Sequence, residues 1–179
     1  MTGFEFLFTF AGLLLGLAVA AVATGFADMW RVRDTMTIGL ATPLLGIYIL
    51  LAAAGAWVSL WGAREFLTMG PGELLRSVSM AMPYIFVAQA MFPFQHDKWT
   101  SLEDYYLRHH RVLLAVLIIP SGVSFLYNLA VGYQPHIFDV LGYGVPLLVP
   151  AVLIVWSRPT VQWLGLAVLS LNALLLMFV

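Results

Sequence analysis

Residues 4–27 read FEFLFTFAGLLLGLAVAAVATGFA, and this stretch decides the fold class, because its one charged residue is Glu5 beside the start. A helix rises about 1.5 Å per residue, so a run of this length reaches across the roughly 30 Å hydrocarbon core of a bilayer. Similar apolar runs follow at residues 37–60, 74–94, 111–131, 138–156 and 161–178. The sequence therefore predicts an all-α, polytopic transmembrane bundle of about six spans, forming one domain over residues 1–179.

The composition supports the same class. The chain is 62% hydrophobic and only 9% charged, whereas about a quarter of the residues in a soluble domain are charged. The absence of cysteine excludes disulfides and thiolate-bound metals. A net charge of -1 without a basic run argues against nucleic acid as a partner. We expect membrane lipids to surround the chain, and we expect no cofactor.

Basic residues divide unequally between the two ends of the predicted spans. Loops on one side hold Arg31, Arg33, Lys98, Arg108, Arg111 and Arg158, and the other side holds Arg64 and Arg76. Lys and Arg are enriched in cytoplasmic loops. This pattern predicts that the first, third and fifth loops are cytoplasmic and that both termini lie on the non-cytoplasmic side.

Small residues recur every four positions in the first predicted span, at Gly12, Gly16, Ala20 and Thr24. Such residues let helix backbones approach closely in a membrane. We expect this stripe to pack against another span or against a second copy of the chain. In the fifth predicted span, Gly and Pro are frequent, so we expect that span to be the most irregular.

Polar residues inside a membrane need a partner or a cavity. The candidates at or near membrane depth are Glu5, Gln89, Ser124, Tyr127, Asn128, Asp139, Tyr143 and Asn172. They are expected either to line a polar vestibule open to the non-cytoplasmic side or to hold the bundle together by interhelical hydrogen bonds. No predicted span carries a charge at its centre, which disfavours an ion-coupled pump.

The loop between the third and fourth spans is the most polar segment. Thr100 with Glu103, or Ser101 with Asp104, forms a capping box that predicts an interfacial helix over about residues 101–110. Its metal-ligating side chains are His96, His109, His110 and Glu103. Their spacing matches no common ligand pattern, so we expect contacts with lipid headgroups and no metal site. We assign no catalytic residue.

Several short motifs resemble an uncharacterised family of small bacterial inner-membrane proteins with about six spans. They are the N-terminal Phe4-Glu5-Phe6, the tryptophans at 57 and 61 followed by Arg64, and the Tyr105-Tyr106 and His109-His110-Arg111 segment before the fourth span. The resemblance implies this topology and a location in the bacterial inner membrane. It implies no activity and no catalytic residue.

Three functions are compatible with the sequence. The first is a non-enzymatic integral membrane subunit that self-associates or packs into a larger membrane complex. The second is a passive transporter or channel for a small neutral or amphipathic solute. The third is a lipid-binding or lipid-modifying protein, with the loop histidines at headgroup level.

Overall fold

The computed structural model describes residues 3–62, 64, 70–94, 98–130, 132 and 140–178. Within these residues the regular elements are α1 (Gly3–Val32), α2 (Ala41–Gly62), α3 (Pro71–Ala90), α4 (Leu102–Ala130), the π-helical η2 (Val140–Gly144), α6 (Val145–Val155) and α7 (Pro159–Leu175). Apart from an isolated bridge between Thr37 and Ser101, all regular structure in the described parts is helical. The predicted all-α fold is confirmed.

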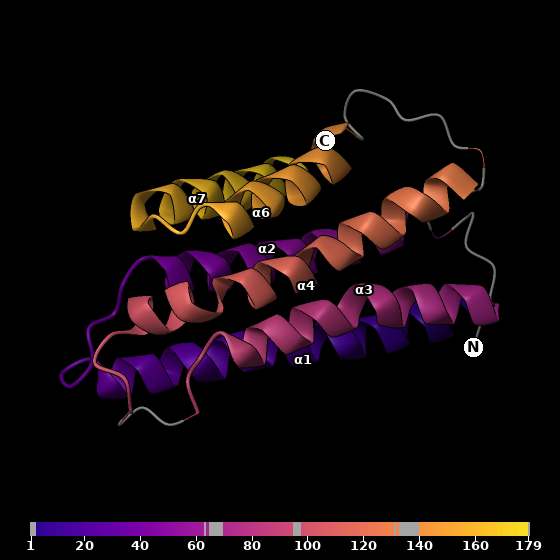
Figure 1. The fold of residues 1–179 in the computed structure, drawn as a ribbon. Helices are drawn as coiled ribbons and strands as arrows, with labels where there is room; N and C mark the ends of the chain where they lie inside the picture. The colour runs from indigo at the N-terminus through magenta and orange to yellow at the C-terminus, as the bar shows by residue number, and fades with distance from the viewer. Residues whose placement is uncertain are drawn as a thin grey trace.

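The helices form three stacked pairs, α1 beside α3, α2 beside α4 and α6 beside α7 (Figure 1). Further contacts between α1 and α2, α3 and α4, α2 and α7, and α4 and α6 join the pairs. One end of the bundle, here called the terminal end, holds the start of α1, the end of α7 and the start of α3 (Figure 1). The opposite loop end holds residues 33–40, 98–101 and 156–158.

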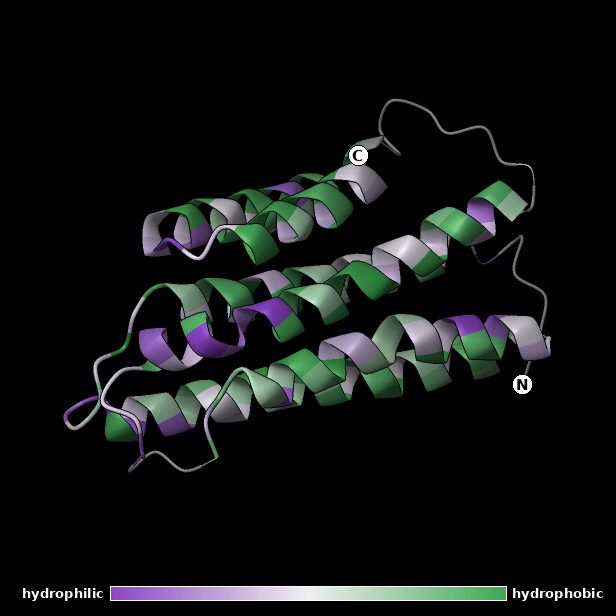
Figure 2. Cartoon of the chain, viewed as in Figure 1, coloured by the Kyte–Doolittle hydropathy of each residue, from purple (hydrophilic) through white to green (hydrophobic). Residues whose placement is uncertain are grey.

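Three helices, α1, α2 and α4, are long and apolar enough to cross a membrane. Figure 2 shows that hydrophobic residues predominate along these helices. In the most apolar 18-residue stretch of each helix, only 28%, 28% and 22% of the residues are buried inside the protein, so most of that apolar surface faces outward. Of the other predicted spans, α3 has 20 residues but carries polar side chains along its length. The apolar helices at Leu141–Val155 and Pro159–Leu175 are shorter.

The predicted interfacial helix and the fourth predicted span form one continuous helix, α4, of 29 residues. The Ser101 hydroxyl accepts a hydrogen bond from the Asp104 amide at 3.4 Å, so Ser101 supplies the cap. At 1.5 Å per residue α4 is about 43 Å long, which exceeds the roughly 30 Å hydrocarbon core. The fifth predicted span is irregular as expected, since it begins as the π-helical η2 before Val145.

The face of α1 that packs inside the chain differs from the small-residue stripe. The buried positions are Leu7, Ala11, Leu15, Ala18, Val22, Gly25 and Met29. They recur every three or four residues, which keeps them on one face, whereas residues strictly four apart drift around the helix by about 40° per step. A Cβ added at Gly12 would therefore lie 3.4 Å from Trp57 Nε1, whereas one added at Gly16 would meet nothing within 4 Å. Ala20 and Thr24 are exposed.

Candidate functional site

Two adjoining cavities lie at the terminal end of the bundle. The first has a volume of about 200 Å³ and lies between α1, α2, α3 and α4. The second, of about 160 Å³, extends toward η2 and α7 and shares Ala56, Ser59, Met80, Tyr84, Ser124 and Tyr143 with the first. The polar residues that line one or both are Tyr48, Ser59, Glu73, Arg76, Ser77, Tyr84, Ser121, Ser124, Asn128, Tyr143 and Asn172.

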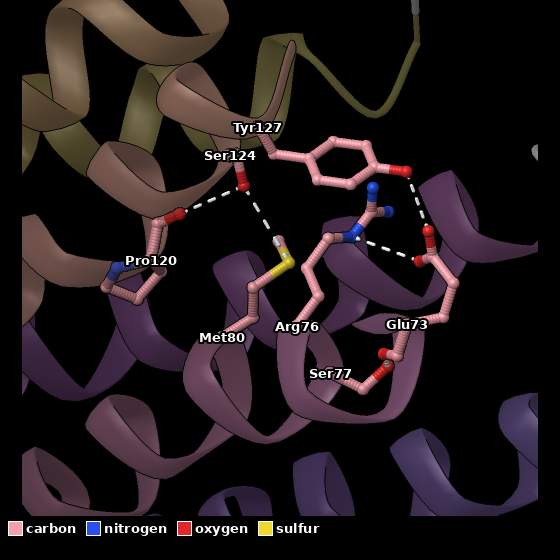
Figure 3. Close-up of polar contacts among 7 residues, drawn as sticks. All are labelled: Glu73, Arg76, Ser77, Met80, Pro120, Ser124 and Tyr127. Carbon is pink, nitrogen blue, oxygen red and sulfur yellow. Dashed lines mark hydrogen bonds and ion pairs between the residues drawn. The ribbon is translucent and has the colours of Figure 1, made fainter. Parts of the chain in front are cut away.

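An ion pair in the first turns of α3 lies beside the first cavity (Figure 3). Arg76 Nε lies 3.5 Å from Glu73 Oε2, and the two side chains are only 25% and 15% exposed. Tyr127 of α4 donates a hydrogen bond to Glu73 Oε1 at 2.7 Å, and its ring lies 4.4 Å from the Arg76 guanidinium carbon. Tyr127 therefore holds α4 against the charged turn of α3.

Short hydrogen bonds join the other polar groups around the cavities. The Ser124 hydroxyl donates to the Pro120 carbonyl at 2.9 Å and lies 3.7 Å from Met80 Sδ (Figure 3). Asn128 Nδ2 donates to the Tyr143 hydroxyl at 2.7 Å. Asn172 Nδ2 donates to the Leu141 carbonyl at 3.3 Å. Amides from α4 and α7 thus hold η2, whose π-helical turns occur in proteins mostly at functional positions.

The first cavity extends deep along α3. Its lining runs from Glu73 to Tyr84, which is 11 residues, or about 16 Å at 1.5 Å per residue. That depth is about half of the roughly 30 Å hydrocarbon core. Deeper in, the lining is mostly apolar, with Leu15 and Ala81 beside Met80, and the phenol of Tyr84 lies at the inner end.

Five of the eight polar candidates come together here, namely Ser124, Tyr127, Asn128, Tyr143 and Asn172. The other candidates are elsewhere. Glu5 is exposed on α1, Gln89 lies in an open groove between α1 and α3, and Asp139 lies outside the described residues. Four of the five line the cavities, whereas Tyr127 lies beside them and bonds to Glu73. Asn128 and Asn172 also donate hydrogen bonds to η2. Whether they form a solute pathway stays a prediction.

Sequence reasoning did not select Glu73 and Arg76 as site residues. Each lies near a predicted span edge, where charges are ordinary. Their separation by three residues could have identified them, because it places both side chains on one face of a helix that starts at Pro71.

The loop end is closed by a buried polar network. The Tyr106 hydroxyl donates to Gln162 Oε1 at 2.7 Å, and both residues are 0% exposed. Gln162 Nε2 donates to the carbonyls of Leu153 and Trp156, each at 2.7 Å. Glu103 accepts hydrogen bonds from Trp163 Nε1 at 2.6 Å and from the first amide of α2 at 3.2 Å. These contacts join α4, α6, α7 and the start of α2.

The weak metal-ligand candidates that the structure describes make other contacts. Glu103 belongs to the network above, and His109 Nδ1 donates to the Tyr105 carbonyl at 2.9 Å. His110 is 3% exposed, and its Nδ1 donates to the Leu107 carbonyl at 2.6 Å. His96 lies outside the described residues. Among the residues that the structure places, no group of three metal-ligating side chains gathers.

Comparisons of the chain with protein-family models, with curated proteins and with solved structures found no match. The resemblance to an uncharacterised bacterial membrane family therefore stays a prediction.

Proposed function

We propose that this chain is a multi-pass protein of the bacterial inner membrane that takes up a small amphipathic solute through its terminal end. The observation that carries the proposal is the polar-lined cavity, which extends about 16 Å along α3 inside a bundle with an apolar exterior. Bundle interiors between helices are common places for ligand sites. In this proposal α1, α2 and α4 cross the bilayer, and the shorter or more polar α3, α6 and α7 cross beside them.

The buried network at the loop end favours a solute-binding protein or a gated carrier, and it argues against an open pore. Tyr106 and Gln162 have no exposed surface, so a solute in the first cavity meets packed side chains beyond Tyr84. Passage to the other side would require these helices to move apart. The excess of basic residues in the loops at this end supports a cytoplasmic position for it. The cavity would then open to the non-cytoplasmic side.

Cysteine labelling tests whether the cavity admits solutes. The chain contains no cysteine, so a Ser124→Cys variant carries a single thiol. The reagent is 2-sulfonatoethyl methanethiosulfonate, which is charged and does not cross lipid. We expect it to modify Ser124→Cys in protein reconstituted in nanodiscs, and also in intact cells if the terminal end faces outward.

Ser170 provides a matched control. Like Ser124, it is a helical serine whose hydroxyl donates to the carbonyl four residues earlier, here Leu166 at 2.9 Å. It is 9% exposed and does not line either cavity. Ser170→Cys is expected to stay unmodified. Equal protection of Ser124→Cys and Ser170→Cys would overturn the proposal, because it would mean that the cavity is closed to solutes.

Self-association is a second candidate function, favoured by the outward position of the small-residue stripe on α1. Gly16 is exposed and a Cβ added there would meet nothing within 4 Å, although small residues in a membrane helix commonly mark a close contact. A Gly16→Leu variant would then be monomeric in native mass spectrometry while the wild type is a dimer or larger. Gly62→Leu, at another glycine with no neighbour within 4 Å, is the control and should keep the wild-type mass. A monomeric wild type would exclude this function.

A further inference from the structure

The first cavity contains one positive and one negative side chain, and the remainder of its lining is uncharged. Among the described lining residues of both cavities, only Glu73 and Arg76 are acidic or basic side chains. Their opposite charges cancel, so the site is neutral overall. Bringing a ligand with a net charge into a low-dielectric site is costly unless an opposite charge compensates it. A ligand that is neutral overall but carries both signs matches this lining best.

The contact between Glu73 and Arg76 is loose. Its N···O distance is 3.5 Å, whereas charge-assisted hydrogen bonds are usually about 2.7–2.9 Å long. The contact runs from Nε of Arg76, and the guanidinium carbon also lies 4.4 Å from the centre of the Tyr127 ring (Figure 3). A guanidinium carries five N–H donors, two of which can bind a carboxylate through parallel hydrogen bonds. Arg76 therefore has more donors than its contact with Glu73 uses.

The size and polarity gradient of the cavity restrict the ligand further. A cavity of 150 Å³ holds a molecule the size of benzene, so one of about 200 Å³ holds roughly eight non-hydrogen atoms. Charged and amide groups lie at its outer part, and its inner part is formed by Leu15, Met80 and Ala81 together with the phenol of Tyr84. A ligand with a short apolar tail would place that tail in the inner part of the cavity and its ionic groups in the outer part.

We propose that the Glu73–Arg76 pair binds a small zwitterion with a short apolar side chain, the chemical class of an apolar amino acid. Arg76 takes the carboxylate, Glu73 takes the ammonium group, and the apolar tail lies beside Met80. This inference rests on the proposed solute-binding function, and it names the substrate class of that same cavity.

Calorimetric titration of the full chain in phosphatidylglycerol nanodiscs tests the inference, with L-leucine as the probe. 3-Methylbutylamine lacks only the carboxylate of leucine, and 4-methylpentanoate lacks only its amine. We expect each analogue to bind at least tenfold more weakly than leucine, since one charge of the site is then left unmatched. This comparison uses only the wild-type protein and so does not depend on the folding of a variant.

Variants of Arg76 and Glu73 test which charged group of the ligand each side chain binds. Arg76→Gln and Glu73→Gln should each weaken leucine binding at least tenfold, and Arg76→Lys should weaken it less than Arg76→Gln. Arg64 lies just beyond the end of α2, over the Trp61 ring, and does not line the cavity. Arg64→Gln should therefore bind leucine within twofold of the wild type. Equal binding of leucine and its two analogues, or no binding of leucine, would overturn the inference.

Cysteine labelling and a change of lipid distinguish failure of the zwitterion inference from failure of the solute-binding proposal. If the Ser124→Cys thiol is labelled but leucine does not bind, the zwitterion inference is wrong while the solute-binding proposal stands. If that thiol is protected, both are wrong. Phosphatidylethanolamine also carries an ammonium and an acidic oxyanion, so nanodiscs containing it form a third arm. Stabilisation by this lipid that depends on Arg76, without leucine binding, would assign the pair to a headgroup and overturn the free solute as ligand.

Discussion

Gln162→Leu tests the network that closes the loop end. Leucine has nearly the volume of glutamine, so the substitution removes hydrogen bonds without opening a large cavity. Gln162 makes three such bonds, to the Tyr106 hydroxyl and to the carbonyls of Leu153 and Trp156, each at 2.7 Å. Because Gln162 is 0% exposed, water cannot replace the lost partners.

The expected loss of unfolding free energy follows from this count. A net contribution of about 1 kcal/mol per hydrogen bond gives about 3 kcal/mol for the three. Side-chain hydrogen bonds in a membrane protein average about 0.6 kcal/mol, which gives about 2 kcal/mol. We therefore expect Gln162→Leu to lower the unfolding free energy by about 2–3 kcal/mol. Tyr106→Phe removes only one of these bonds and should cost about 1 kcal/mol.

The measurement is equilibrium unfolding of the purified protein by dodecyl sulfate in mixed micelles, followed by circular dichroism. Gln89→Leu is the control, because Gln89 is exposed on α3 and makes no hydrogen bond to another described residue. It should change the unfolding free energy by less than about 0.5 kcal/mol. The double variant Tyr106→Phe/Gln162→Leu should cost no more than Gln162→Leu alone, since both changes remove the same bond. A Gln162→Leu effect as small as that of the control, or strict additivity in the double variant, would refute this account of the loop end.

Three further substitutions test packing and charge in the same assay. At Gly165 an added Cβ would lie 2.6 Å from a methyl group of Leu153, which is itself 1% exposed, so Gly165→Ala should destabilise by about 1–3 kcal/mol. Gly16→Ala, where nothing lies within 4 Å, should be neutral or stabilising by up to about 1 kcal/mol, and equal effects at the two glycines would argue against this packing. Glu103→Gln should cost about 1–2 kcal/mol, because it weakens charge-assisted bonds from Trp163 and from the start of α2. An unchanged unfolding curve for Glu103→Gln would show that the carboxylate charge does not stabilise this junction.

The loop between the third and fourth predicted spans shows which features local sequence patterns can predict. The capping residues in it predicted a helix near residue 101, and Ser101 does cap α4. The sequence suggests that Glu103 belongs to a capping box and names it as a weak candidate for a metal ligand. In the structure its carboxylate accepts a hydrogen bond from Trp163, 60 residues away. No local pattern contains that contact, because it depends on how α4 and α7 are placed side by side.

The small-residue stripe shows a second limit. Spacing by four residues indicated that Gly12, Gly16, Ala20 and Thr24 share a face that packs. An added Cβ would meet a side chain of another helix at Gly12 but not at Gly16, and Ala20 and Thr24 are exposed. Helix rotation about its own axis is set by the packing of all neighbours together. A seven-residue spacing of Ala11, Ala18 and Gly25 marks the face that α1 buries.

The sequence by itself determined the class of structure and its medium. Long apolar runs with few charges can satisfy their backbone hydrogen bonds in lipid only as helices, and this constraint acts locally along the chain. Only the tertiary structure decided that Glu73, Asn128 and Tyr143, from α3, α4 and η2, surround a common cavity. Their proximity depends on helix order, rotation and the shape of η2, which arise from contacts between segments far apart in the chain.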